Sequence, residues 1–152
     1  ICHEPKLLLL DEPASALDPI ARSNFLDLLL EIIQTEDRTI IISSHILSDI
    51  EKVIDHVIIM DEGKIISDST FDELRERFYR VQLAGCVSFD QLGIENVIEK
   101  QYDSGQAILI IRDSDPETIR QAVAKHNCKC EISMLSLEDI YKATIFKKLI
   151  LN

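Results

Sequence analysis

The stretch that decides the fold is LLLLDEPASALDP, residues 7–19 of this 152-residue chain. Its four consecutive leucines lack the alternation of a half-exposed strand, and they predict a strand covered on both faces, as in parallel sheets. Asp18-Pro19 then predicts the start of a helix, because Asp is a good N-cap and Pro is favoured at the first helical position. Two acidic residues, Asp11 and Glu12, therefore stand where the predicted strand ends.

The segments that follow continue this alternation of strand and helix. Thr70 and Glu73 have the spacing of a capping box and predict a further helix start. The expected elements are helices at 18–34, 46–53 and 70–78, strands at 39–43, 56–60 and 65–67, and a hairpin turn at 61–64. Strands that alternate with helices indicate an α/β fold with a parallel sheet.

The pattern changes from Tyr79 onward. We expect strands at 80–84, 96–102, 107–112 and 130–135, helices near 89–93 and at 116–126, and a last helix at 137–148. The order β-α-β-β-α-β is that of the split βαβ arrangement in a ferredoxin-like domain. The sequence therefore predicts two domains, residues 1–78 and residues 79–152.

Charge is distributed unevenly along the chain. The chain has 27 acidic and 16 basic residues, a net charge of −11, and residues 1–76 hold 17 of the acidic residues but only 6 of the basic ones. This balance argues against non-specific binding to nucleic acid or to anionic lipid, since both are polyanions. No apolar stretch approaches the roughly 18–20 residues that span a bilayer, so the sequence predicts a soluble protein.

Three potential metal ligands lie close together in the second half, namely His126, Cys128 and Cys130. On a strand their side chains would point to one face. A zinc site usually needs a fourth ligand or an open water position, and no partner pair is visible in the sequence. We therefore favour two small, half-buried, reduced thiols over a metal site.

Candidate site residues gather at the predicted strand ends. Asp11 and Glu12 end one strand, and His45 follows the next. Ligands of open α/β sheets bind beyond the carboxyl ends of the strands. Adjacent side chains diverge, so one carboxylate can hold a hydrated Mg²⁺ while the other faces an attacking water, as phosphoryl transfer requires. The alternatives are solvated acids and a structural histidine, and Asp18 can be an N-cap in either case.

These residues resemble a known family. Residues 7–12 look like the Walker B segment of ATP-binding-cassette (ABC) ATPases, residues 15–18 like their D-loop, and His45 like their switch histidine. Residues 4–78 are similar to the second half of an ABC nucleotide-binding domain. Residues 79–146 are similar to the C-terminal accessory domain of many bacterial ABC export ATPases. The sequence departs from the commonest pattern at Ala14, where Thr is frequent, and at Ala16, where Gly is frequent.

The resemblance implies a fold and a role for each site residue. The fold would be the second half of a P-loop NTPase (RecA-like) domain, followed by a smaller α+β ferredoxin-like domain with a C-terminal helix. Asp11 would hold Mg²⁺ through water, Glu12 would be the general base, and His45 would contact the γ-phosphate of ATP and the attacking water. Ser15 to Asp18 would line the interface with a second copy of the domain and couple the two ATP sites.

The resemblance also implies partners and a location. A transmembrane permease subunit would be the main partner, nucleic acid would not be one, and the protein would lie in the cytoplasm on the inner face of the membrane. The sequence contains no G-x-x-x-x-G-K-[ST] phosphate loop, and the family's signature motif is also missing. We therefore expect a fragment of an exporter ATPase that is inactive by itself, because nothing in it cradles the β- and γ-phosphates.

Two other classes of function are weighed against this interpretation. A non-enzymatic regulatory or dimerisation module would gain nothing from intact Asp11, Glu12 and His45. An ABC ATPase acting in DNA repair shares a similar acidic strand end, but a long coiled coil would be expected there, and the acidic charge disfavours it.

Overall fold

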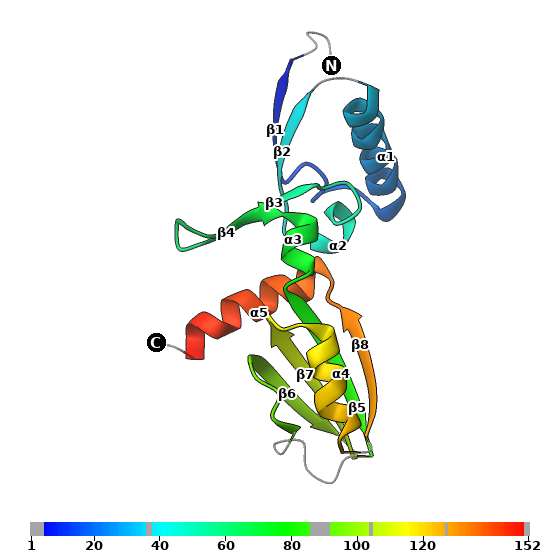
Figure 1. Cartoon of the computed structure of the whole chain (residues 1–152). Coiled ribbons are helices and arrows are strands. Elements are labelled where there is room, and N and C mark those ends of the chain that lie inside the picture. Colours follow the sequence, from blue (N-terminus) through cyan, green and yellow to red (C-terminus); the bar gives the residue numbers. More distant parts are fainter. Residues whose placement is uncertain (1–4, 36–37, 86–91, 104, 127, 151–152) are drawn as a thin grey trace. The chain divides into compact units, whose positions relative to one another are not determined.

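A computed structural model of the chain describes residues 5–35, 38–85, 92–103, 105–126 and 128–150 (Figure 1). These residues form a mixed α/β structure that divides into two compact units, residues 1–54 and residues 55–152. The first unit contains the parallel strand pair, and the second contains a hairpin and an antiparallel sheet. The predicted domain boundary after residue 78 falls inside the second unit and stays a prediction.

The first unit is a strand–helix–strand unit followed by a short helix. Its elements are β1 (Leu7–Asp11), α1 (Pro19–Thr35), β2 (Thr39–Ser43) and α2 (Leu47–Ile50). β1 pairs in parallel with β2, and α1 lies to one side of the pair (Figure 1). The predicted strands and the long helix are confirmed. The predicted two-turn helix is a single turn, because the backbone leaves the helix after Ile50.

The prediction that the leucine strand is covered on both faces is wrong. Leu8 is 8% exposed, but Leu7 and Leu9 on the other face are 51% and 70% exposed, and Ile41 opposite Leu9 is 55% exposed. The parallel pair has two strands only, and nothing in the described residues of the first unit covers this face. The run of leucines is therefore apolar on both sides while only one side is packed.

The second unit begins with a hairpin and continues into a four-stranded sheet. Its elements are β3 (His56–Asp61), β4 (Lys64–Thr70), α3 (Phe71–Arg75), β5 (Phe78–Ala84), β6 (Val97–Asp103), β7 (Gln106–Arg112), α4 (Pro116–Ala124), β8 (Lys129–Met134) and α5 (Leu137–Ile150). β3 and β4 pair antiparallel around the predicted turn, where Glu62 and Gly63 both have positive φ, as a two-residue loop of type I′ requires. The larger sheet has the order β6-β7-β5-β8 with every pair antiparallel. The helix expected near 89–93 lies largely outside the described residues.

The three helix starts described in this unit carry side-chain caps, and at α5 the Ser136 hydroxyl accepts the Asp139 N–H at 3.2 Å. Thr70 accepts the Glu73 N–H at 3.2 Å, and the Glu73 carboxylate accepts the Thr70 N–H at 3.1 Å, which confirms the capping box. This helix ends at Arg75 rather than near residue 78, because Phe78 already pairs in β5. Asp115 caps α4 by accepting the N–H and the hydroxyl of Thr118, both at 3.0 Å, and these bonds lower the pKa of the Asp115 carboxyl.

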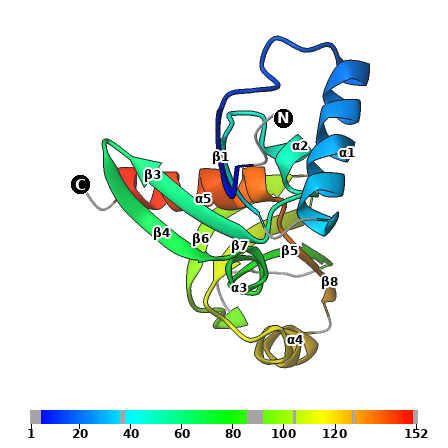
Figure 2. The same cartoon turned by 90° about the horizontal axis from the view of Figure 1, so that it is seen from above.

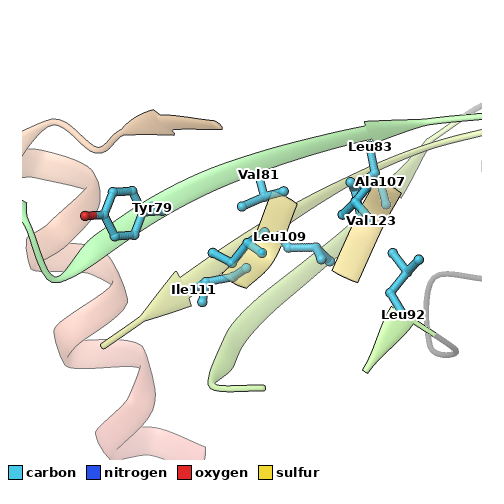
Figure 3. Close-up of a cluster of buried hydrophobic side chains, with 9 residues drawn as sticks. Tyr79, Val81, Leu83, Leu92, Ala107, Leu109, Ile111 and Val123 are labelled. Carbon is cyan, nitrogen blue, oxygen red and sulfur yellow. The ribbon is translucent and has the colours of Figure 1, made fainter. Parts of the chain in front are cut away.

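One hydrophobic cluster of the second unit lies between α4 and one face of the sheet (Figure 3). Alternate residues of β5 and β7 point to this face, since successive strand side chains point to opposite sides. The cluster comprises Tyr79, Val81, Leu83, Leu92, Ala107, Leu109, Ile111, Ile119 and Val123. α5 lies on the opposite face of the sheet (Figure 2). There, Arg80 of β5 forms an ion pair with Asp139 at 2.8 Å.

Candidate functional site

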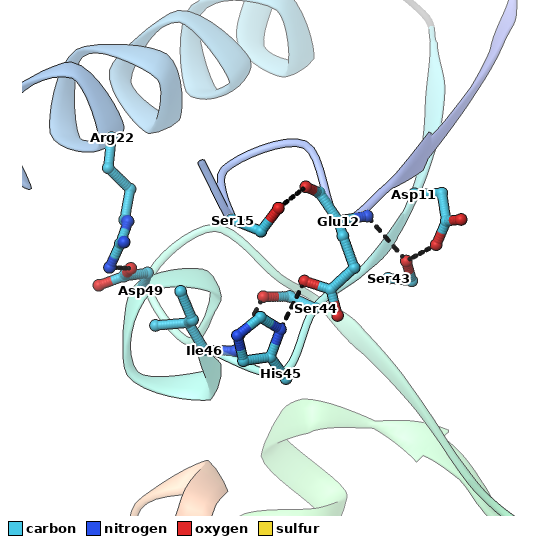
Figure 4. A network of polar contacts seen from close by, with 9 residues as sticks. All are labelled: Asp11, Glu12, Ser15, Arg22, Ser43, Ser44, His45, Ile46 and Asp49. Carbon is cyan, nitrogen blue, oxygen red and sulfur yellow. Dashed lines mark hydrogen bonds and ion pairs between the residues drawn. The ribbon is translucent and has the colours of Figure 1, made fainter. Parts of the chain in front are cut away.

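The register of the parallel pair brings the ends of β1 and β2 together. Asp11 lies opposite Ser43, the last residue of β2 (Figure 4). The Ser43 hydroxyl donates to Asp11 Oδ1 and accepts the backbone N–H of Glu12 at 3.0 Å. The same N–H also approaches the Ser43 carbonyl oxygen at 3.2 Å. One serine therefore contacts both acidic residues that the sequence singles out.

Glu12 has an unusual backbone. Its φ is +45°, in the left-handed region, where an L-residue other than glycine is disfavoured by about 1–2 kcal/mol. Its N–H is held by Ser43, and its carbonyl accepts the Ser15 N–H at 3.2 Å and the Ser15 hydroxyl at 2.9 Å. Strained residues that their surroundings hold on both sides are found most often at functional sites.

The side chain of Glu12 contacts His45. His45 Nδ1 lies 2.7 Å from Glu12 Oε2, a hydrogen-bond distance. A carboxylate can only accept, so the contact has Nδ1–H donating to Oε2. The side chains of His45 and Glu12 are 68% and 38% exposed, so a small molecule or water can reach both.

The two remaining predicted site residues lie in the loop between β1 and α1. Ser15 contacts Glu12 as described, and Asp18 Oδ1 accepts the N–H groups of Ile20 and Ala21 at 2.9 and 3.0 Å. Asp18 is thus an N-cap, which is compatible with a further role for its other oxygen. The structure brings together Asp11, Glu12, Ser15 and His45, and it places Asp18 at the start of α1. Their chemical roles remain predictions.

An ion pair that sequence reasoning missed connects the elements behind the site. Arg22 of α1 donates to Asp49 Oδ2 in α2 at 3.0 Å and to the Leu17 carbonyl at 3.2 Å, with the two side chains 22% and 28% exposed. It therefore joins the loop after Glu12 to the helix that follows His45. Nothing in the sequence pattern pairs Arg22 with Asp49, whereas the Ser43 contact could have been found from the expected register of the two strands.

The described residues contain no group of three His, Cys, Asp or Glu side chains that could hold a metal ion. Cys128 precedes β8 rather than lying in it, and both Cys128 and Cys130 are half-buried against the core cluster. Burial raises the pKa of the free Cys130 thiol. Cys128 is disulfide-bonded, so the expectation of reduced thiols does not hold at that residue.

Comparisons with known proteins agree on one class of protein. No protein-family model matches the chain. It is 46% identical over 77 residues to the bacitracin transport ATP-binding protein BcrA of Bacillus licheniformis, a match that covers 51% of this chain and 25% of BcrA. It is 42% identical over 74 residues to the energy-coupling factor transporter ATP-binding protein EcfA2 of Ligilactobacillus salivarius strain UCC118, covering 49% of this chain and 26% of EcfA2.

A third relative matches nearly the whole chain. It is YhcH of Bacillus subtilis strain 168, an uncharacterized ABC transporter ATP-binding protein, 29% identical over an alignment of 151 positions that covers 91% of this chain and 47% of YhcH. The chain thus spans between a quarter and a half of the length of these relatives. In the part of the chain that the structure describes, every helix is too short or too polar to cross a membrane. The homologues of this chain are therefore ATP-binding proteins of ABC transporters, and the chain matches only a part of them.

Proposed function

We propose that the chain is the C-terminal part of an ABC transporter ATP-binding subunit, which in its complete form hydrolyses ATP to power export across a membrane. The observation that carries this proposal is the contact of Glu12 with His45 at 2.7 Å, beside Asp11, at the carboxyl ends of two parallel strands. Phosphoryl transfer depends on positioned acids and bases at such an edge. The similarity of the chain to BcrA, EcfA2 and YhcH, each named as an ATP-binding protein, supports it.

Glu12 would act as the general base. Its carboxylate would accept a proton from the water that attacks the γ-phosphate. His45 would position that water and contact the phosphate. A neutral imidazole has a single N–H, so the ring donates either to Glu12 or to the phosphate, and it donates to both only as the imidazolium.

The donor set at Asp11 fits a hydrated Mg²⁺. Mg²⁺ is commonly held by one or two carboxylates together with waters and substrate phosphates, so a three-ligand protein cluster is not required. Asp11 is exposed at the end of β1, and the Ser43 hydroxyl engages its Oδ1. A bound Mg²⁺ would neutralise charge on the phosphates, while Asp11 would orient its water ligands.

The two parts of the chain would have different roles in this protein. Residues 1–78 would be the second half of the P-loop NTPase domain, and residues 79–152 a ferredoxin-like accessory domain with its C-terminal helix. The antiparallel order β6-β7-β5-β8 supports the second assignment, because a β-α-β-β-α-β chain gives that order in a split βαβ fold. The match to YhcH, which covers 91% of the chain, supports the presence of both parts in one protein.

The proposal includes the partners of the complete protein. A second copy would contact the loop that carries Ser15 and Asp18, and a transmembrane permease would hold the subunit at the inner face of the membrane. The names of BcrA as a transport protein and EcfA2 as a transporter protein support the permease. The chain alone would neither bind nor hydrolyse ATP, since the phosphate loop is not in its sequence.

The test is Glu12→Gln in the complete ATPase. The amide keeps the shape of the side chain but cannot accept the proton, so turnover should fall on the order of 10²–10⁴-fold while Mg-ATP binding is retained. Glu62→Gln is the matched control, because Glu62 is also a glutamate with positive φ but lies in the β3–β4 turn. Steady-state phosphate release near the wild-type rate in Glu12→Gln would remove Glu12 from the mechanism and favour a docking module.

A further inference from the structure

We propose that Ser43 is a positioning residue for the two acidic side chains, its hydroxyl fixing the Asp11 carboxylate and the Glu12 backbone as one unit. This inference rests on the proposed ATPase function. It adds a role for a residue to which neither the sequence pattern nor the names of the relatives assign one.

The Ser43 hydroxyl both donates and accepts a hydrogen bond. It has one proton to donate and lone pairs to accept, and it donates to Asp11 Oδ1 while accepting the Glu12 N–H at 3.0 Å. Asp11 is the last residue of β1 and Glu12 follows the strand, and their carboxylates have different partners: that of Asp11 contacts Ser43, and that of Glu12 contacts His45. A single atom on the neighbouring strand therefore sets the rotation of one carboxylate and the backbone from which the other departs.

The contacts predict a small structural effect and a larger functional one. If the hydroxyl is removed, the Glu12 N–H keeps the Ser43 carbonyl at 3.2 Å, so no buried donor is left unpaired. Ser43 is itself exposed, so its truncation leaves no cavity. The Asp11 carboxylate, in contrast, loses the one hydrogen bond that the described contacts give its Oδ1. Groups that orient a metal ligand typically change metal affinity or activity by about 10–100-fold when removed.

The place of Ser43 in the chain gives it a third connection. It is the last residue of β2 and lies two residues before His45, whose ring contacts Glu12. Residues 43–45 therefore make three contacts with the acidic pair. The Ser43 hydroxyl contacts the Asp11 carboxylate and the Glu12 backbone N–H, and the His45 ring contacts the Glu12 side chain. Displacement of Ser43 would disturb all three groups of the proposed site together.

The experiment compares Ser43→Ala, Ser43→Thr and Ser43→Val in the complete ATPase. Thr and Val have nearly the same shape and both suit a strand, but only Thr keeps the hydroxyl. The readouts are kcat, the Mg²⁺ concentration for half-maximal activity, ATP binding without Mg²⁺, and the melting temperature. Ser133→Ala, a change at an exposed serine of β8 in the other unit, is the control.

We expect Ala and Val to lower kcat about 10-fold and to raise the half-maximal Mg²⁺ concentration by a similar factor. Metal-free ATP binding and the melting temperature should stay close to wild type, and Thr should restore both kinetic values. The inference is overturned if Val behaves like Thr, or if the melting temperature falls while the Mg²⁺ dependence does not move. Loss of turnover in Glu12→Gln together with normal kinetics in Ser43→Val would refute this inference alone, whereas turnover in Glu12→Gln would refute the proposed function.

Discussion

The left-handed backbone of Glu12 makes a prediction that can be measured without turnover. Replacement of Glu12 by Gly and by Ala removes the same carboxylate, and therefore the same contact with His45, so the two variants differ mainly in backbone preference. Glycine adopts φ near +45° without the 1–2 kcal/mol that an L-residue loses there, although it is more flexible in the unfolded chain by about 0.5–1 kcal/mol. Glu12→Gly should therefore be more stable than Glu12→Ala by roughly 0.5–1 kcal/mol.

The same comparison of Gly and Ala at a second site in this unit corrects for the flexibility that glycine adds to the unfolded chain. Glu51, at the end of α2, has φ −52°, in the right-handed region. There Gly should be less stable than Ala by about 0.8–1 kcal/mol. The difference between the two pairs should equal the strain itself, about 1–2 kcal/mol.

The assay is hydrogen exchange at the β1 and β2 amides of the 152-residue chain, which reports the opening of the first unit by itself. Urea denaturation of the same four variants provides an independent stability scale. If Gly is less stable than Ala by the same amount at both positions, Glu12 stores no strain, and the explanation of its held backbone fails.

Three further predictions follow from contacts elsewhere in the molecule. Leu83→Ala should lower the free energy of unfolding of the second unit by about 3 kcal/mol, because Leu83 is 1% exposed in the core cluster. A loss below about 1 kcal/mol in a urea titration would contradict this packing. The hydrogen bonds with Thr118 lower the pKa of Asp115 from its ordinary value of 3.8. The stability that this cap contributes should therefore be present above pH 3.8 and be lost as the pH falls through the lower pKa of the folded state. Acid unfolding of Asp115→Asn, followed by circular dichroism, should lack this component. A double-mutant cycle of Arg22→Ala and Asp49→Ala should give a coupling of about 1 kcal/mol, and additive losses would mean that the ion pair contributes nothing.

Local signals in the sequence predict much of the first unit. The leucine run, the Asp18-Pro19 pair and the isoleucine-rich segment give β1, α1 and β2 within one or two residues, since each depends on its own residues. The sequence predicts the ends of helices less accurately. α3 stops at Arg75 because Phe78 and Tyr79 belong to a strand whose partners, in β7 and β8, lie far along the chain.

The missed features of the site have the same physical origin. The sequence points to Asp11, Glu12 and His45, but the positive φ of Glu12 has no residue signal, because glutamate is not a residue that favours it. The Ser43 bridge depends on strand register, and the exposure of Leu7 and Leu9 depends on what else packs against the sheet. All three are tertiary properties that a local pattern does not contain.

The in-register pairing of β1 with β2 also determines which changes in chain length the site can tolerate. Leu7 to Asp11 match Thr39 to Ser43 one for one, and every strand residue points to the face opposite that of its neighbour. Deletion of one residue within β2 would turn its apolar side chains to the opposite face and carry the Ser43 hydroxyl away from Asp11. Insertion of a residue ahead of Thr39 leaves that matching intact. Over evolutionary time, length variation should therefore accumulate before β2 and be excluded within it.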